Sequence, residues 1–282
     1  MPVALVTGAS RGLGRATARA LAARGWSLVI DARGADALQT VAGELTVAVT
    51  RPNVTSPNVT SPNVTVTTIP GDVADPRHRT ALAAAVHQHG RLDLLVNNAS
   101  VLGPSPQPEL ADYPFDELAR VYDVNVFAPL ALVQLMLPLL AESAGSIVNV
   151  SSDAAVEAYP GWGGYGSAKA ALDQLTAVLA VERPSLRAYS FDPGDMRTQL
   201  HQQAFPGEDI SDRPAPETVV PALLRLVDER PASGRYRVRD STAVRDGTAV
   251  RDGTAVRDGT AVSVATAVGD TAAVDTAVGP VS

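Results

Sequence analysis

Along residues 1–239, short apolar runs alternate with longer segments in which apolar residues recur every three or four positions. A short apolar run bounded by turn residues is typical of a buried parallel strand, and the longer period is typical of a helix. The pattern predicts strands at 4–7, 27–31, 66–69, 92–97, 146–151, 187–191 and 235–238. It predicts helices at 12–24, 35–45, 77–89, 115–140, 164–183 and 216–228. This alternation predicts one α/β domain, a Rossmann-like doubly wound sheet of about seven parallel strands flanked by helices.

Two segments depart from this alternation. Residues 51–65 repeat Pro-Asn-Val-Thr three times, and the chain from about Ser241 repeats Thr-Ala-Val-Arg-Asp-Gly. Stacked repeat folds need units of about 20 residues or more, because shorter units cannot bury an apolar face. We therefore expect a folded domain at 1–239, with 51–65 as a loop insertion, and a low-complexity, disordered tail at 240–282.

A glycine-rich turn follows the first predicted strand. The sequence Thr-Gly-Ala-Ser-Arg-Gly-Leu-Gly places Gly8, Gly12 and Gly14 between that strand and the first helix. Gly8 permits a sharp turn, Gly12 lets the backbone approach a pyrophosphate, and Gly14 allows close helix packing. The N-terminus of the helix adds free N–H groups and a partial positive charge. A glycine turn in this context predicts a dinucleotide-binding site.

Further polar residues follow the glycine turn in a distinctive order. They are Asn97, Asn98, Ala99, Asn125, Ser152, Tyr165 and Lys169. Together with the glycine turn they resemble the short-chain dehydrogenase/reductase family, classical type, over residues 2–239. The glycine spacing G-x-x-x-G-x-G is similar to that of classical members rather than to the extended, epimerase-type members. The resemblance implies an NAD(P)-dependent oxidoreductase.

The resemblance also implies which residues bind the cofactor. They are Gly8, Ser10, Arg11, Gly12, Leu13, Gly14, Arg33, Asp72, Val73, Asn98, Ala99, Tyr165, Lys169, Pro193, Gly194 and Thr198. Asp72 and Val73 match the family's adenine-contacting pair, and Pro193, Gly194 and Thr198 match the element that receives the nicotinamide carboxamide. Ser100 stands where the family has glycine, and its Cβ is expected to alter the loop slightly.

The end of the second predicted strand bears on the choice between NADP(H) and NAD(H). Asp31 lies near the place of an acid that hydrogen-bonds a ribose 2′-hydroxyl. In the family pattern, however, that acid's position falls on Ala32, and Arg33 follows it. Arg33 and Arg11 can clamp a 2′-phosphate through charge-assisted hydrogen bonds. We therefore expect NADP(H) as the preferred cofactor, with NAD(H) as the alternative.

Tyr165 and Lys169 are the central candidates for catalysis. Hydride transfer to a carbonyl leaves an alkoxide that needs a proton, and a phenol with a pKa of about 10 is a poor proton donor and acceptor near neutrality. Lys169, one helical turn after Tyr165, brings a positive charge that favours the phenolate. By resemblance, Lys169 also binds the nicotinamide ribose, and Ser152 holds the substrate oxygen against Tyr165. Asn125 resembles the residue that anchors a water relay behind the lysine.

Other kinds of site have less support. His87 and His89 point to different faces of a helix, and no cluster of His, Asp and Glu has the spacing of metal ligands. Ser152 lacks the G-x-S-x-G elbow of a serine hydrolase. The chain has no cysteine, which excludes a thiolate site, and its net charge of −7 argues against a nucleic-acid partner. We expect no metal.

The sequence also bears on location and assembly. The first predicted strand begins almost at Met1, which leaves no room for a secretory signal. The longest apolar run, 126–140, contains two prolines and is too short to span a bilayer, so we expect a cytoplasmic protein without a membrane partner. The predicted helices 115–140 and 164–183 carry apolar residues around most of their circumference, which predicts a homodimer or homotetramer.

These observations predict a carbonyl reductase or secondary alcohol dehydrogenase with Tyr165 as general acid/base and a small ketone, aldehyde or alcohol as substrate. Substrate specificity is expected from the loops 153–164 and 196–213. Two alternatives stay open. One is a catalytically weak NADP(H)-binding sensor of the same fold, and the other is an isomerase or dehydratase that uses bound cofactor. Turnover that depends on the Tyr165 hydroxyl distinguishes a reductase from a sensor.

Overall fold

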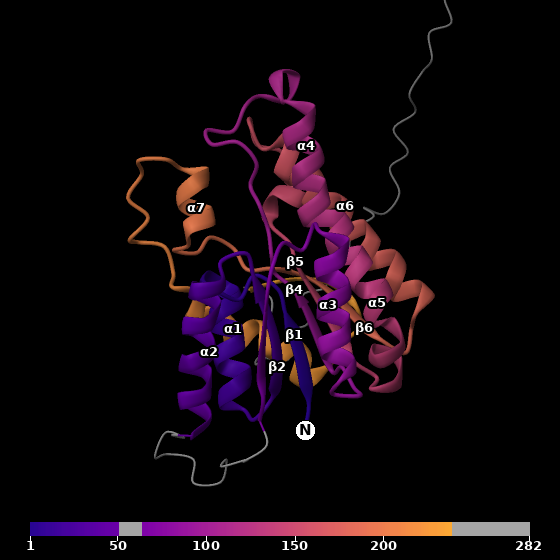
Figure 1. The fold of residues 1–282 in the computed structure, drawn as a ribbon. Coiled ribbons are helices and arrows are strands. Elements are labelled where there is room, and N and C mark those ends of the chain that lie inside the picture. The colour runs from indigo at the N-terminus through magenta and orange to yellow at the C-terminus, as the bar shows by residue number, and fades with distance from the viewer. Residues whose placement is uncertain (51–63, 239–282) are drawn as a thin grey trace, which may run out of the picture. The chain divides into compact units, whose positions relative to one another are not determined.

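Seven parallel strands form one sheet in the order β3-β2-β1-β4-β5-β6-β7, with helices on both faces (Figure 1). The strands are β1 (Val3–Val6), β2 (Ser27–Ala32), β3 (Val66–Pro70), β4 (Leu94–Asn97), β5 (Ser146–Val150), β6 (Arg187–Asp192) and β7 (Gly234–Arg237). The helices are α1 (Gly12–Ala23), α2 (Ala35–Thr50), α3 (Pro76–His87), α4 (Phe115–Tyr122), α5 (Ala128–Glu142), α6 (Gly163–Glu182), α7 (Gln199–Ala204) and α8 (Val220–Glu229). This computed structural model describes residues 1–50 and 64–238, so most of the 51–65 repeat and all of the 240–282 tail lie outside the described residues.

The predicted doubly wound fold is confirmed, and each predicted strand is present within two residues of its expected bounds. The strand order reverses between β1 and β4, because the chain runs outward to β3 and then returns to the other side of β1. In open parallel sheets, the carboxyl ends of the strands beside such a reversal form a crevice in which ligands bind. The fold therefore points to the loops after β1 and β4 as the place to look for a site.

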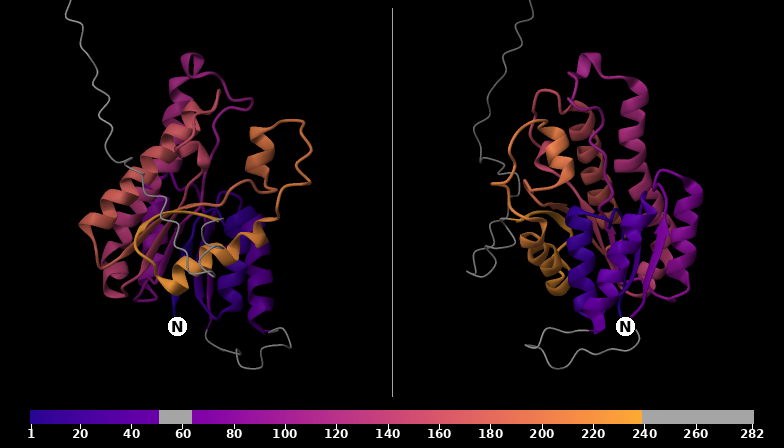
Figure 2. Two further views of the ribbon diagram at one scale, coloured as in Figure 1. Left: turned by 180° about the vertical axis from the view of Figure 1, so that it is seen from behind. Right: turned by 60° about the vertical axis from the view of Figure 1, so that its left-hand side comes forward.

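The apolar core consists of two layers, one on each face of the sheet. One layer joins α1, α2 and α8 to the sheet through residues such as Leu21, Leu38 and Leu223. The other joins α3 and α5 to it through Leu82 and Met136. Successive side chains of a strand point to opposite faces, and β1 accordingly contributes to both layers. Figure 2 shows α8 beside α1, on the face opposite to α5.

Three helical boundaries differ from the sequence-based expectation. The predicted helix 115–140 is α4, a π-helical turn at Asp123–Phe127 and then α5. The predicted loop 196–213 contains α7, whose N-cap is Thr198. The predicted helix 216–228 begins as a 3-10 turn at Pro216–Thr218 and becomes α-helical only at Val220.

The apolar helical run is longer than the sequence pattern indicated. Residues Phe115–Glu142 form 28 helical residues whose best window has a mean hydropathy of 2.0, which is long and apolar enough to cross a membrane. The expectation that this run is too short is therefore wrong. However, 56% of that window is buried inside the fold, where Leu132 and Met136 pack on the sheet. Burial in the core accounts for part of the apolarity of the run.

We propose that the folded domain ends at Arg239. Removing residues 240–282 should leave the melting temperature unchanged within about 2 °C, because a segment of six-residue repeats is predicted from its sequence to bury no apolar face. Differential scanning calorimetry of the two chains tests this. A second truncation after Pro231 removes β7, and with it the ion pairs of Arg235 with Asp173 and Asp192, and should unfold at a clearly lower temperature. Failure of the 1–239 chain to fold would show that the boundary is misplaced.

Candidate active site

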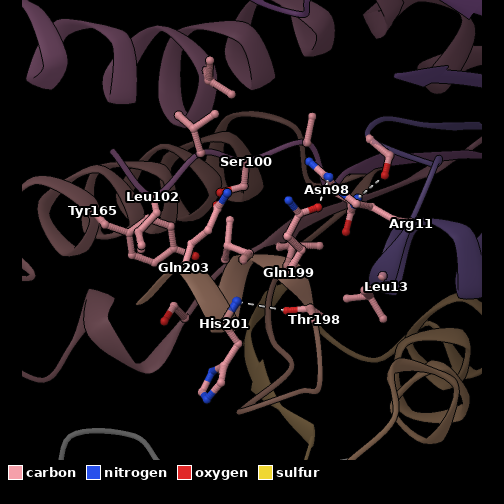
Figure 3. A pocket seen from close by; sticks show the side chains of 18 of the residues that line it. Arg11, Leu13, Asn98, Ser100, Leu102, Tyr165, Thr198, Gln199, His201 and Gln203 are labelled. Atoms are coloured by element: carbon pink, nitrogen blue, oxygen red, sulfur yellow. Dashed lines mark hydrogen bonds between the residues drawn. The ribbon is translucent and has the colours of Figure 1, made fainter. Parts of the chain in front are cut away.

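A cavity of about 580 Å³ opens at the carboxyl edge of the sheet. It is lined by the loops that follow β1, β2, β3, β4, β5 and β6 and by residues of α4, α6 and α7. The structure places every predicted site residue on its wall except Gly14 and Asn125, which lie behind it. Figure 3 shows Arg11 and Asn98 toward one end of the cavity and Tyr165 and Leu102 toward the other. A cavity of this size can hold a dinucleotide and a small substrate.

The glycine turn after β1 is held tightly by its neighbours. Gly8 has φ +65°, a conformation that favours glycine, and its N–H donates to Asp31 Oδ1 at 2.7 Å. Asn98 Nδ2 donates to the carbonyl oxygens of Thr7 and Gly8 at 2.8 and 3.2 Å. A Cβ on Gly14 would lie 2.5 Å from the oxygen of Gly8, so only glycine allows α1 to begin this close to the turn.

The first turn of α1 fits a phosphate group. It has no acidic residue and no side chain that hydrogen-bonds its terminal N–H groups. These N–H groups and the positive end of the helix dipole lie where Ser10, Gly12 and Leu13 line the cavity. The chemistry of this turn therefore suits the pyrophosphate of a dinucleotide.

Asp31, which its position places near a ribose 2′-hydroxyl, has other hydrogen-bond partners in this structure. It is 1% exposed, and besides accepting from Gly8 it pairs through Oδ2 with His78 Nε2 at 3.0 Å. Burial raises the pKa of Asp31, and the hydrogen bonds from His78 and Gly8 act in the opposite direction. Asp31 thus holds the glycine turn. His78, which the sequence analysis missed, completes this arrangement from α3.

The two arginines expected to clamp a 2′-phosphate lie differently. Arg33 is exposed and lines the cavity just after β2, and it takes part in none of the ion pairs found among residues 1–50 and 64–238. Arg11 instead hydrogen-bonds Gln199 Oε1 on α7, at the other side of the cavity. Arg33 is therefore the candidate cation for a 2′-phosphate at the end of the cavity beside β2, because Arg11 is hydrogen-bonded to α7.

Three of the candidate catalytic residues converge at the other end. Tyr165 and Lys169 lie on α6, with Lys169 Nζ 5.5 Å from the centre of the Tyr165 ring, and both side chains are buried. Lys169 Nζ donates to the carbonyl oxygen of Val150 at 2.7 Å. Ser152 follows β5, and its hydroxyl donates to Asp153 Oδ1 at 2.9 Å. Tyr165, Lys169 and Ser152 all line this end of the cavity.

The protonation of this pair differs from the expectation. Burial raises the pKa of Tyr165 above its ordinary value, the charges of Asp153 and Asp192 raise it further, and a hydrogen bond with Ser100 acts in the opposite direction. Burial also lowers the pKa of Lys169 to about 8. The sequence analysis expected Lys169 to lower the pKa of Tyr165, whereas this pKa is raised in the structure, and burial is the largest cause. Tyr165 is protonated at neutral pH and can donate a proton.

Asn125 supports the site from behind. It is fully buried in the π-helical turn, and its Oδ1 accepts hydrogen bonds from the Ser100 hydroxyl and the Val101 N–H, each at 3.0 Å. Its Nδ2 donates to the Val101 carbonyl at 2.8 Å. Asn125 thus fixes the loop after β4. Ser100 stands where the family has glycine, and its hydroxyl donates a hydrogen bond to Asn125 within this loop.

Arg235 is a further residue that the sequence analysis missed. Its Nη2 donates to the carbonyl oxygen of Ser152 at 2.8 Å and to Asp192 Oδ2 at 2.9 Å, and its Nε donates to Asp173 Oδ2 at 3.0 Å. One guanidinium on β7 therefore ties together the ends of β5 and β6 and the helix that carries Tyr165. Among the described residues, no group of three or more His, Cys, Asp and Glu side chains could hold a metal ion.

Comparisons with known proteins identify the family of this chain. The model of the short chain dehydrogenase family matches residues 2–209. Benzil reductase ((S)-benzoin forming) of Saccharomyces cerevisiae is 38% identical over 160 residues, which cover 54% of this chain and 59% of that protein. The oxidoreductase YciK of Escherichia coli K12 is 32% identical over 80% of this chain and 86% of its own length. A short chain dehydrogenase from Escherichia coli CFT073, solved in complex with NADPH, superposes with a TM-score of 0.74 at 28% identity, covering 84% of this chain and 96% of that one.

Proposed function

The chain belongs to the short-chain dehydrogenase family, and on that premise we propose that it is an NADP(H)-dependent reductase of ketones or aldehydes, or in reverse a secondary alcohol dehydrogenase. As a member of this family it is an oxidoreductase. The observation that carries the proposal is the convergence of Ser152, Tyr165 and Lys169 at one end of a cavity whose other end is the glycine turn. Benzil reductase, by its name a carbonyl reductase, supports it, although this chain covers only 59% of that protein.

Each residue at the catalytic end has a distinct chemical task. Bound NADPH would supply the hydride to the carbonyl carbon. Tyr165, protonated at neutral pH, donates its proton to the oxygen that becomes the alcohol. Ser152 hydrogen-bonds the same oxygen, and the ammonium of Lys169 stabilises the phenolate that Tyr165 leaves. Arg235 holds Ser152 in place through its backbone carbonyl.

The preference for NADP(H) is supported by Arg33 and by the commitment of Asp31 to the glycine turn. Replacing Arg33 with alanine should raise the KM for NADPH about tenfold to 100-fold, because a hydrogen bond to a charged group contributes about 1.5–3 kcal/mol. The KM for NADH, which has no 2′-phosphate, should change less than about threefold. Steady-state kinetics with both nucleotides measure this, with Arg91→Ala, which removes an exposed arginine paired with Asp93, as the charge control. Equal effects on NADPH and NADH would contradict the assignment.

The test of the proposed function is turnover. NADPH and NADH oxidation is followed spectrophotometrically over a panel of ketones, aldehydes and quinones. We expect turnover with NADPH on at least one class of carbonyl compound. Nucleotide binding without turnover on the whole panel would favour the alternative of a cofactor-binding sensor.

We further propose that the chain assembles as a homodimer or homotetramer through α4, α5 and α6. Phe115 is 85% exposed, Phe127 55% and Val181 81%, and all three lie on the helical run 115–142 or on α6. Exposed large apolar residues on neighbouring helices are typical of an interface. Light scattering of the purified chain should give two or four times the chain mass of 29.2 kDa. A monomeric mass would contradict this proposal.

A further inference from the structure

Asp153 differs from the other carboxylates of the cavity in its lack of an ion-pair partner among the described residues. The acidic residues that line the cavity are Asp31, Asp72, Asp153, Asp192 and Asp195. Four of them lie within ion-pair distance of a cationic side chain: Asp31 of His78, Asp72 of Arg120, Asp192 of Arg235, and Asp195 of His201 and Arg213. Asp153 takes part in none of the ion pairs found in the described part of the chain. A half-buried carboxylate without a cationic partner has capacity to bind one.

Asp153 is also hydrogen-bonded directly to one of the proposed catalytic residues, Ser152. Its Oδ1 accepts hydrogen bonds from the Ser152 hydroxyl at 2.9 Å and from the Ala154 N–H at 2.8 Å. Its Oδ2 accepts only a long hydrogen bond from Tyr159, at 3.3 Å, whose hydroxyl is held more closely by Glu157 at 2.7 Å. When Ser152 turns its single hydroxyl hydrogen to a substrate oxygen, Asp153 loses that donor. A donor on the substrate itself would replace it.

We propose that Asp153 is a specificity residue that binds an ammonium group on the carbon next to the substrate carbonyl. The substrate class is then α-amino ketones, and in the reverse direction 1,2-amino alcohols. This inference rests on the proposed function and names the substrate class for it. In the reduction, NADPH is oxidised to NADP⁺ as its hydride forms the new C–H bond. Tyr165 supplies the proton to the oxygen, and the ammonium group is unchanged.

The distances allow this recognition. A substrate oxygen bound to Ser152 lies about 2.7 Å from its Oγ, which places Asp153 Oδ1 within about 5.6 Å of that oxygen. A nitrogen on the adjacent carbon is about 3 Å from the carbonyl oxygen by ordinary bond geometry, so it can reach the carboxylate at hydrogen-bond distance. The charge of Asp153 raises the pKa of Tyr165, and an ammonium bound there would offset this charge.

The rest of this end of the cavity suits an apolar body on the substrate. Leu102 and Ala154 cluster with Tyr165, and Trp162 and Leu200 pack against them. The Trp162 and Tyr165 rings lie edge to face with centroids 5.9 Å apart. An apolar wall with one unpaired carboxylate is the arrangement expected for a cation that carries an aromatic or aliphatic group.

The first test measures binding, so that it does not depend on turnover. Isothermal titration of the enzyme–NADP⁺ complex at pH 6 compares 1-aminopropan-2-one, protonated at that pH, with butan-2-one, its uncharged counterpart of the same shape. We expect the charged ketone to bind about tenfold more tightly than the neutral one, and Asp153→Asn to abolish this preference. Asp195→Asn, which removes a carboxylate of the same cavity that already has partners, should keep it. Equal affinity of both ketones for the wild-type complex would overturn the inference.

The second test follows turnover of the same two ketones with NADPH. The ratio of kcat/KM for the charged ketone over the neutral one should fall about tenfold in Asp153→Asn and stay constant in Asp195→Asn. If Asp153→Asn lowered kcat/KM for both ketones in proportion, Asp153 would act through Ser152 alone, and the inference would be wrong. Binding preference without any turnover would instead count against the proposed reductase and leave the ligand class supported. NADP⁺ affinity of each variant shows that the fold is intact.

Discussion

Replacing Tyr165 with phenylalanine should lower kcat/KM for carbonyl reduction about 10³-fold, the size of effect expected when a general acid is removed. The variant loses one hydroxyl and keeps the ring, which packs edge to face with Trp162 and within the cluster of Leu102 and Ala154. NADPH affinity, which we assign to the glycine turn and Arg33, should change less than about threefold. Stopped-flow transfer of hydride from NADPH to a ketone, together with nucleotide titration, separates the two effects.

Tyr159→Phe is the matched control for this experiment. Its hydroxyl is hydrogen-bonded to Glu157 and Asp153 in an exposed segment, so its loss should leave reduction within about threefold of the wild type. A Tyr165→Phe enzyme that kept more than a tenth of its activity would show that another group or water supplies the proton.

The pKa of Tyr165 sets the expected pH dependence of the wild type. Because burial and the charges of Asp153 and Asp192 raise this pKa above its ordinary value of about 10, the phenol keeps its proton throughout neutral pH. Reduction, which needs the protonated phenol, should not decline between pH 6 and 7.5 on account of this group. Alcohol oxidation, which needs the phenolate, should accelerate as pH rises. A reduction rate that fell through pH 6–7.5 would place the acid elsewhere.

The features that sequence reasoning predicted correctly depend on short-range patterns. The strands and helices follow from apolar periodicity, and the glycine turn from three glycines within one strand-to-helix connection. Tyr165 and Lys169 are four residues apart on α6, so their proximity follows from helix geometry alone. These patterns carry enough information because each is complete within one element or one turn.

The features that sequence reasoning missed depend on residues that only the folded sheet brings together. His78 meets Asp31 across 47 residues, and Arg235 meets the carbonyl of Ser152 across 83. Neither pair has a spacing that a sequence pattern could reveal. The direction of the Tyr165 pKa shift was wrong for a related reason. The sequence shows a neighbouring lysine but not the burial of the phenol, which is the largest cause of the shift in the pKa of Tyr165.

Lys169 is proposed to act in catalysis, and its burial lowers the stability of the folded state. It is the only lysine in the chain, since all the other residues among the 23 Lys and Arg are arginine. An arginine would not fit here, because its planar guanidinium is larger than the ammonium of lysine. The buried ammonium is 2% exposed and donates to Val150, yet burial lowers its pKa from 10.5 to about 8. A shift of this size means that the charged lysine destabilises the folded state by about 3 kcal/mol at pH 7.

Lys169→Met should therefore stabilise the protein while inactivating it. Removing the buried charge gains about 3 kcal/mol, and leaving the Val150 carbonyl unpaired costs about 1 kcal/mol. The melting temperature should then rise by about 4–8 °C, and kcat should fall about 100-fold or more as the phenolate loses its cation. Calorimetry and single-turnover kinetics measure the two quantities. Lys169→Arg keeps the charge but adds bulk in a packed site, so it should lower both the melting temperature and kcat.

The lowered pKa of Lys169 also determines whether the free energy of unfolding rises or falls with pH. Between pH 8 and 10.5 the folded state binds fewer protons at this site than the unfolded state, so the contribution of Lys169 to stability rises with pH. The difference in the free energy of unfolding between Lys169→Met and the wild type should accordingly be largest below pH 8 and decrease as the pH approaches 10.5. Because the chain has one lysine, ¹³C-lysine labelling gives a single side-chain resonance whose titration reports this pKa directly. A midpoint near 10.5 would mean that the ammonium is solvated, and both the expected stabilisation and its pH dependence would then be absent.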